Sequence, residues 1–336
     1  MSELSIAFIA DGSFFLPSVV ALTSLLENKK KTSEYQVYFV VVDFSKEQKD
    51  VLWKMANSKQ VTLGFVEINA DDIRKKYEGI AKHECCASIS ALLKFDLPYI
   101  FDEINKLLYL DGDIIVQSDL SILADMDFRE DEYAAVVEDS GILYNKNLIK
   151  QNTEQYFNSG VMLLNLDALR KNNIPEYLFQ KKIQDIDNSL MDQHVFNKVF
   201  KGHIRLLPHK YNVLYTNLIR AKYFYTLSIE EINSRYHTEY KDWNEMRDEA
   251  AIIHYSSFDK PWKYSDVTGV EIWDSYYRIS PLCNDILVRK KLHIPLLNRM
   301  REKKGLSLFA SFIWECETKG CGSAIKDVFR FLGTPN

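Results

Sequence analysis

The sequence has few cysteines and no long apolar run, and each absence excludes a class of protein. The five cysteines are odd in number and form no CxxC pair, so neither a disulfide framework nor a zinc site is indicated. We expect them to be reduced thiols packed as small apolar groups. The longest uncharged apolar runs, such as 306–314, are far shorter than the ~20 residues that a membrane-spanning helix needs.

The N-terminus and the charge balance exclude two further classes. Residues 1–12 lack the positively charged stretch and apolar core of a secretory signal. The formal net charge of −5 argues against a nucleic-acid-binding protein, and no internal repeat or low-complexity segment is present. We therefore expect a cytoplasmic protein, with peripheral contact at the inner face of the cell membrane as a further option.

The composition is that of a folded protein with an ample core. Of the 336 residues 46% are hydrophobic, and Tyr and Phe each occur 19 times. A chain of this length and composition buries one large core, with a smaller appendage at most. We expect a main domain at 1–280 and a basic, aromatic extension at 281–336.

Strand-like and helix-like patterns alternate along the chain. The capping-box spacing of Ser45 and Gln48 marks one helix start. We expect strands at 4–10, 35–43, 61–66, 106–110, 133–138, 161–166 and 251–255, and helices at 17–26, 45–57, 88–95, 175–185 and 191–200. This order predicts an α/β fold with a mixed, mainly parallel sheet flanked by helices. Ligands bind beyond the carboxyl ends of such strands, where Asp11 and Asp111 both fall.

The strongest chemical signal is the run LLYLDGDIIV at 107–116. Asp111 and Asp113 follow an apolar strand, and in an extended backbone side chains two residues apart leave on the same face. The two carboxylates can then bind one hard cation, and Gly112 lets a ligand approach the backbone. Water, diphosphate oxygens or another side chain would complete the shell. A metal so held neutralises charge on a diphosphate leaving group. The alternative is a solvated acidic turn.

The last segment changes in character after residue 280. Basic residues crowd together and the aromatic run 306–314 follows, a pattern that predicts attachment to an anionic membrane surface. A C-terminal helix packed on the main domain with a charged outer face explains the pattern equally well. The basic residues are Arg289, Lys290, Lys291, Arg299, Arg301, Lys303 and Lys304.

Four blocks together resemble glycosyltransferase family eight, which includes bacterial lipooligosaccharide galactosyl- and glucosyltransferases and the glycogenins. LLYLDGDIIV is followed in the family's order by FNSGVMLLNL at 157–166, MDQHVFN at 191–197 and IIHYSSFDKPW at 253–262. The resemblance covers residues 4–265. It implies a GT-A fold with a C-terminal helical extension here, and a retaining transfer that depends on Mn²⁺, with Mg²⁺ as an alternative.

The resemblance also assigns roles to single residues. It makes Asp111, Asp113 and His254 the metal ligands, and Lys260 the contact to the diphosphate. It places Ala10, Asp11 and Ser13 at the nucleoside, although a helix-capping serine would explain Ser13 equally well. Gly112, Asn158 and Ser159 would line the donor, and Asp192 and Gln193 would stand beside the anomeric carbon. Asn158, Asp192 and Gln193 are the candidate catalytic residues.

Two positions depart from the family pattern. Lys94 stands where the family commonly has Arg beside the donor, so the charge is kept without the bidentate fork. Ser257 or Phe258 stands where Gly is common. Both changes leave the donor sugar open, with UDP-galactose and UDP-glucose as the candidates. The acceptor would be a glycan, a lipid-linked glycan or a glycoprotein, bound by loops at 140–156 and 211–240.

Two rival functions remain at this point. LDGDII is similar to the nucleophile motif of haloacid-dehalogenase phosphatases, but that motif lies near the N-terminus and has Thr or Val where Ile115 stands. A glycan- or nucleotide-binding module that has lost catalysis is the non-enzymatic alternative. The sequence also leaves two routes to retention, a covalent intermediate or attack from the face that the diphosphate leaves.

Overall fold

The computed structural model describes residues 3–77, 89–139, 156–184, 191–214, 228–256, 260–265, 267, 269–285 and 287–290. The strands are β1 Leu4–Asp11, β2 Tyr35–Val42, β3 Thr62–Ile68, β4 Lys106–Leu110, β5 Ile114–Val116, β6 Ala134–Glu138, β7 Phe157–Asn165, β8 Ile204–Leu206, β9 Val213–Leu214 and β10 Ile252–His254. The α-helices are α1 Phe15–Asn28, α2 Lys46–Ser58, α3 Ala70–Lys76, α4 Leu97–Ile100, α6 Leu166–Lys171, α7 Ile174–Gln184, α8 Met191–Val199, α10 Ile229–Tyr236, α11 Trp243–Asp248 and α12 Val270–Ile279.

In the described part of the chain a seven-stranded sheet has the order β3-β2-β1-β4-β7-β6-β8. Every neighbouring pair in it is parallel except the two that involve β7, which is antiparallel to β4 and to β6. The predicted mixed, mainly parallel sheet is confirmed. Because β7 is reversed, its first residues lie beside the carboxyl ends of β1 and β4.

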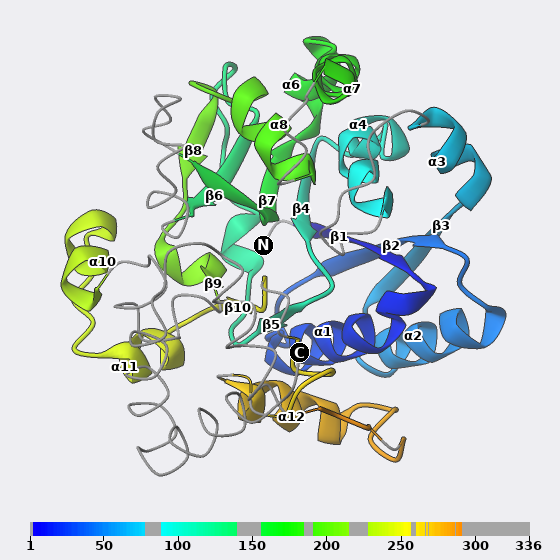
Figure 1. The fold of residues 1–336 in the computed structure, drawn as a ribbon, viewed down its shortest axis with the longest axis vertical. Coiled ribbons are helices and arrows are strands. Elements are labelled where there is room, and N and C mark those ends of the chain that lie inside the picture. Colours follow the sequence, from blue (N-terminus) through cyan, green and yellow to red (C-terminus); the bar gives the residue numbers. More distant parts are fainter. Residues whose placement is uncertain are drawn as a thin grey trace, which may run out of the picture.

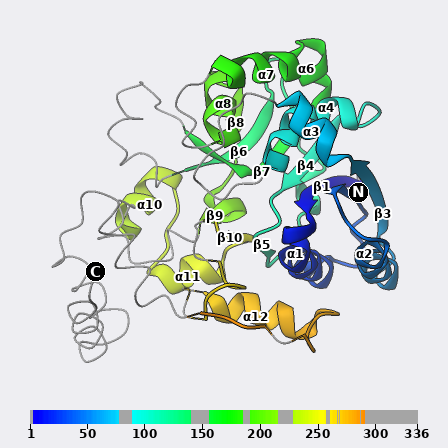
Figure 2. The same cartoon turned by 45° about the vertical axis from the view of Figure 1, so that its right-hand side comes forward.

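Alternation along β1 explains why both faces of the sheet are covered (Figure 1). Ile6 and Phe8 belong to the apolar cluster that includes α1 and α2, whereas Ala7 and Ile9 belong to the cluster that includes α4, α6 and α8. A strand buried on both faces reads as a continuous apolar run, as the sequence of β1 does. Figure 2 shows α1 and α2 on one side of the sheet and α6, α7 and α8 on the other.

Most predicted elements lie within a few residues of their observed bounds, and the Ser45–Gln48 capping box is present. The predicted helix at 88–95 is instead a 3-10 helix, Ile89–Asp96, followed by α4. Pro98 has no N–H to donate to the carbonyl four residues earlier, so an α-helix cannot continue across it. The predictions did not include the helices α3, α6, α10, α11 and α12 or the short strands β5, β8 and β9.

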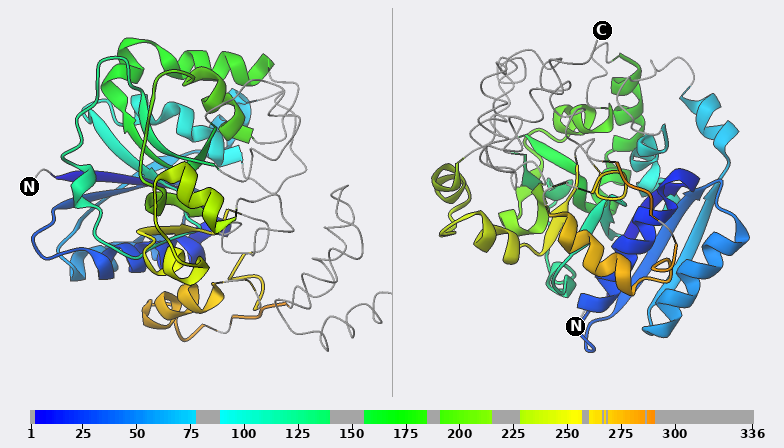
Figure 3. Two further views of the ribbon diagram at one scale, coloured as in Figure 1. Left: turned by 90° about the vertical axis from the view of Figure 1, so that its left-hand side faces the viewer. Right: turned by 60° about the horizontal axis from the view of Figure 1, so that its bottom comes forward.

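A small second sheet carries the last part of the main domain. Its order is β5-β10-β9, and it packs with α10, α11 and α12 around buried Trp273 and Tyr255. Figure 3 shows α12 running beside α1, and Asn28 at the end of α1 donates to the Tyr276 hydroxyl at 2.8 Å. This sheet brings residues near 254 against the turn after β4.

The segment after residue 280 is described only as far as 290. Its chain still contacts the main domain, because the Ser265 N–H donates to the Lys290 carbonyl at 3.0 Å and Lys290 N–H donates to Lys263 at 2.9 Å. Cys283 is exposed, so the prediction of a packed thiol is wrong there. The other cysteines and the predicted aromatic run lie outside the described residues. Among the helices that the structure does describe, none has the length and apolar character to cross a membrane.

Candidate active site

The Asp-Gly-Asp segment lies between β4 and β5, at the carboxyl end of the central strands. Asp111 leaves β4 with its N–H bonded to the Gly160 carbonyl at 2.8 Å, and Gly112 and Asp113 form a turn. The expectation of extended backbone here is therefore wrong. The carboxylates converge because the chain turns back into β5, and not because they share one face of a strand.

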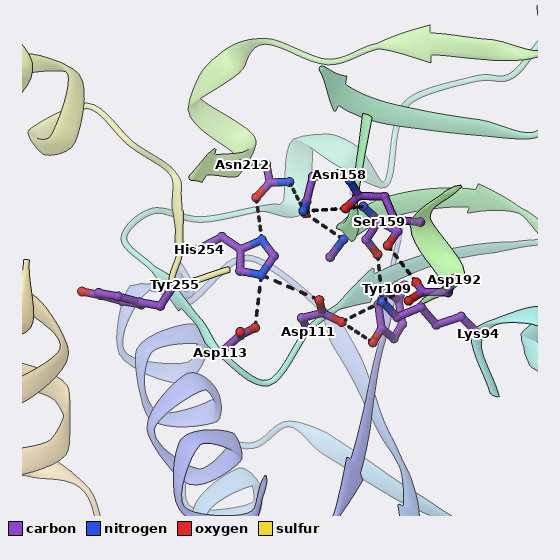
Figure 4. A network of polar contacts seen from close by, with 12 residues as sticks. Lys94, Tyr109, Asp111, Asp113, Asn158, Ser159, Asp192, Asn212, His254 and Tyr255 are labelled. Carbon is purple, nitrogen blue, oxygen red and sulfur yellow. Dashed lines mark hydrogen bonds and ion pairs between the residues drawn. The ribbon is translucent and has the colours of Figure 1, made fainter. Parts of the chain in front are cut away.

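The second sheet brings His254 to the same turn. In the antiparallel pair of β10 and β5 His254 lies opposite Ile114, and the Tyr255 N–H donates to the Asp113 carbonyl at 2.9 Å. His254 Nε2 is 3.1 Å from a carboxylate oxygen of Asp113 and 3.7 Å from one of Asp111. One possible ligand atom from each of the three residues lies within 4.8 Å of the others, so the predicted ligands form one group (Figure 4).

Two glycines near the ligand group leave space for different neighbours. A Cβ on Gly160 would lie 2.2 Å from His254 Cε1 and 2.6 Å from an Asp111 oxygen, so only glycine fits. The Cβ position of Gly112 instead faces Phe14 and Ser18 of the α1 region, at 3.3 and 3.2 Å. The missing side chain of Gly112 therefore accommodates the packing of that region against the turn, a reason that the sequence analysis did not give.

A lysine lies on each side of the carboxylates. Lys260 is ion-paired with Asp113, and its ammonium donates to the Tyr255 carbonyl at 2.6 Å. Burial opposes the ionisation of Asp113, but the nearby Lys260 and His254 lower its pKa below the ordinary value. Asp113 therefore stays ionised, as a metal ligand must be.

Lys94 links Asp111, a predicted metal ligand, to Asp192 and Ser159, which are predicted to lie at the donor sugar. This buried ammonium is 3.1 Å from Asp111 and 2.9 Å from Asp192, and it donates to the Ser159 carbonyl at 3.3 Å. Burial alone would lower the pKa of Lys94, but the two carboxylates raise it above the ordinary value. Tyr109, whose ring lies 4.9 Å below this ammonium, donates to Asp111 at 2.6 Å.

The predicted sugar-side residues form a connected network of amides. Asn158 donates to the Gln193 side-chain oxygen at 2.9 Å, and Gln193 donates to Asp139 at 3.3 Å. Ser159 Oγ donates to Asp192 at 2.7 Å. The network joins the start of β7, the end of β6 and the first turn of α8, which are far apart in the sequence.

The residues predicted at the nucleoside lie at the end of β1, the neighbour of β4. Ala10 is buried within the strand, and the Asp11 carboxylate accepts from the Ser13 N–H at 3.0 Å and the Ser90 hydroxyl at 3.1 Å. Asp11, and not Ser13, caps the short 3-10 helix Gly12–Phe14. The capping alternative for Ser13 is therefore wrong.

Sequence reasoning missed four polar or small residues of this region, namely Tyr109, Asp139, Gly160 and Asn212. Gly160 had a readable signal, because a glycine inside an apolar strand often marks close approach of another group. Asn212 had none. It falls in the range 211–240 predicted to bind the acceptor, yet 211–214 are buried, and Asn212 contacts His254. The prediction that the acceptor-binding loop begins at residue 211 is therefore wrong.

The fold is that of the GT-A glycosyltransferases. The structure matches the crystal structure of the galactosyltransferase LgtC in complex with donor and acceptor sugar analogs, with a TM-score of 0.68. The match has 21% sequence identity and covers 83% of this chain and 96% of that chain. At this identity the likeness concerns the fold alone.

The sequence comparison then gives the family. Residues 5–266 match Glycosyl transferase family 8, and the chain belongs to this family. It is 29% identical over 282 residues to a lipopolysaccharide 1,2-glucosyltransferase of Escherichia coli, covering 82% of this chain and 78% of the relative. It is 25% identical over 271 residues to the lipopolysaccharide 1,3-galactosyltransferase of Salmonella typhimurium, covering 77% and 73%. The predicted family, fold and enzyme class are confirmed, and the phosphatase and non-catalytic alternatives are wrong.

Proposed function

We propose that this enzyme transfers galactose or glucose from a UDP-sugar to a hydroxyl of a glycan acceptor, with retention at the anomeric carbon. The relatives named for lipopolysaccharide glucosyl and galactosyl transfer support a role in bacterial surface polysaccharide or lipopolysaccharide synthesis. A lipid-linked glycan or a glycoprotein is the wider acceptor class. The observation that carries the proposal is the convergence of Asp111, Asp113 and His254 at the carboxyl ends of β1 and β4.

The ligand chemistry fits a divalent cation of the Mn²⁺ type. Two carboxylates suit any hard cation, and the imidazole of His254 favours Mn²⁺ over Mg²⁺, which remains an alternative. The space left by Gly160 supports the same assignment, since a side chain there would fill the position between His254 and Asp111. When bound, such a cation neutralises the charge that develops on the diphosphate leaving group.

The protein's own residues then divide the remaining work. Lys260, as a compact point charge, would bind the diphosphate, and Asp11 would bind the uracil base. Asn158, Asp192 and Gln193 would orient the sugar and stabilise positive charge at its anomeric carbon. Ser159 would line the sugar beside them, and Lys94 would keep Asp111 and Asp192 at a fixed separation.

The test is release of UDP from a panel of UDP- and GDP-sugars, measured with Mn²⁺, with Mg²⁺ and with EDTA. We expect metal-dependent release from UDP-galactose or UDP-glucose and none with EDTA. Release that is indifferent to EDTA would refute the metal role. The anomeric configuration of the transferred sugar, read by NMR, tests retention. Trapping of a glycosyl-enzyme by mass spectrometry would distinguish the covalent route from same-face attack.

We further propose peripheral contact of the 281–336 extension with the inner face of the cell membrane. Arg289 does not support it, because its guanidinium is ion-paired with Asp274 and packs 5.2 Å from the Trp273 ring. The contribution would come from Lys290, which is exposed, and from the basic residues beyond it. Deleting 306–336 should release the protein from anionic vesicles while UDP release continues, and unchanged vesicle binding would contradict the proposal.

A further inference from the structure

Asn212 is a buried amide that lies between the metal side and the sugar side of the site. It ends the 3-10 helix His209–Asn212, just before β9, and its side chain is 1% exposed. Its Oδ1 is 3.1 Å from His254 Nδ1, and its Nδ2 is 3.1 Å from Asn158 Oδ1. Figure 4 shows this amide joining the imidazole to Asn158.

The direction of every hydrogen bond in this chain follows from one backbone group. The Gly160 N–H can only donate, and it donates to Asn158 Oδ1 at 2.9 Å. That atom is therefore the carbonyl oxygen, so the Asn212 atom facing it must be the NH₂ group. The other end of the Asn212 amide is then its oxygen, which can only accept.

The proton on His254 is fixed by the same reasoning. Because the oxygen of Asn212 faces His254 Nδ1, that ring nitrogen must carry a hydrogen. In the neutral imidazole that binding a cation requires, the lone pair then lies on Nε2, the nitrogen that faces Asp111 and Asp113. The tautomer able to bind a cation beside the two carboxylates is therefore set by an amide that itself touches no cation.

We infer that Asn212 is a positioning residue with two functions. It holds His254 in the tautomer that presents Nε2 to the metal, and it ties that ligand to Asn158 and so to Gln193. Outer partners of this kind contribute about 10- to 100-fold to metal affinity. The inference rests on the proposed function, because it assumes that His254 binds the metal.

The first experiment compares metal affinity in three variants by titration calorimetry with Mn²⁺ at saturating UDP. In Asn212→Ala we expect the Mn²⁺ dissociation constant to rise about 10- to 100-fold. Asn212→Asp keeps an acceptor for Nδ1, so we expect it to recover most of this affinity. It cannot donate to Asn158, so its kcat for UDP release should remain low at saturating metal.

Asn165→Ala is the matched control. Asn165 is on β7, at the end away from the site, where it caps α6 and donates to the Glu132 carbonyl. We expect this variant to lose stability but to bind Mn²⁺ within about twofold of the wild type. A folded Asn212→Ala enzyme that also binds within twofold would overturn the inference.

A second measurement needs no variant that could fail to fold. In wild-type enzyme with ¹⁵N-labelled histidine, loaded with UDP and diamagnetic Cd²⁺, long-range ¹H–¹⁵N correlation reports which His254 nitrogen carries the proton. We expect the proton on Nδ1 and cadmium on Nε2, and the reverse would refute the inference. Wild-type enzyme that binds neither Mn²⁺ nor UDP would instead refute the proposed function itself.

Discussion

The two sides of the site use different chemistry for different purposes. On the side proposed for the metal, Asp111, Asp113 and His254 face a common point, and Lys260 is ion-paired with Asp113. On the side proposed for the sugar, the Asn158 and Gln193 amides bond to each other, and backbone N–H groups fix the directions of these bonds. Two carboxylates, Asp192 and Asp139, accept from this network. The comparison indicates that one side concentrates charge and that the other is held by directed hydrogen bonds. Lys94 and Asn212 are the two bridges between them.

The largest effect should follow from removing charge on the metal side. Asp113→Asn is nearly isosteric but loses the anionic ligand, so we expect kcat/KM for UDP release to fall at least about 10³-fold, because a bound cation contributes several kcal/mol to catalysis. Asp167→Asn is the control, since that exposed side chain pairs with Lys171 on the surface of α6. Near-wild-type turnover of Asp113→Asn would contradict the proposed metal-binding role of Asp113.

Next in size is the loss of the charged bridge. Lys94→Met removes the ammonium between the buried Asp192 carboxylate and the half-buried Asp111 carboxylate, so we expect the free energy of unfolding to fall by about 3 kcal/mol in urea melts. Lys94→Arg keeps the charge and should lose less. Lys171→Met removes an exposed ion pair and should cost under about 0.5 kcal/mol. Equal losses in both lysine-to-methionine variants would show that Lys94 is not a bridge.

A glycine substitution tests whether the predicted metal ligands need the space beside Gly160. Gly160→Ala adds a Cβ that meets His254 and Asp111, so we expect Mn²⁺ affinity, by calorimetry, to weaken roughly 10-fold through displaced ligands. Gly64→Ala, where a Cβ lies 2.8 Å from the Tyr38 ring far from the site, is the matched control. It should lower stability and leave metal affinity unchanged. Weaker binding in both variants would contradict a local effect.

The smallest effect concerns the helix that carries Asn212. Burial lowers the pKa of His209, at the start of this helix, from 6.5 to about 4. The unfolded chain therefore binds a proton between these values that the folded chain does not, and stability falls as pH falls below about 6.5. At pH 5.5 the loss is on the order of 1 kcal/mol. His209→Gln should remove this part of the pH dependence in chemical denaturation, and an unchanged profile would contradict it.

The sequence alone predicted the features that depend on residues close together in the chain. The apolar run before Asp111 predicted both a strand and a cation site, and alternation of strands and helices predicted the sheet. His254 and the sugar-side residues came from family resemblance, because no local pattern links β10 to the turn after β4. Asn212 was misplaced for the same reason, since its role depends on the parallel pairing of β9 with β10.

Other errors came from patterns that were present but were not used. Trp273 and Tyr277 are four residues apart and both are buried, which is the spacing of one face of a helix. The sequence pattern could therefore have predicted α12. The strand before the motif was predicted at its observed bounds, 106–110, but the Asp-Gly-Asp turn was taken as extended because nothing in the motif shows that the chain turns directly after β4.

The reversed strand β7 has a consequence for how such an enzyme can diversify. Glu138 ends β6 and Phe157 begins β7 at the same rim, so the chain between them starts and finishes beside the site. The five-residue register from Lys106 opposite Asn165 to Leu110 opposite Val161 is set elsewhere, by β4. Under the acceptor role predicted for 140–156, insertions between 139 and 156 would change which acceptor is received without shifting Asn158 relative to Asp111. A new specificity would then arise without loss of the geometry around Asp111.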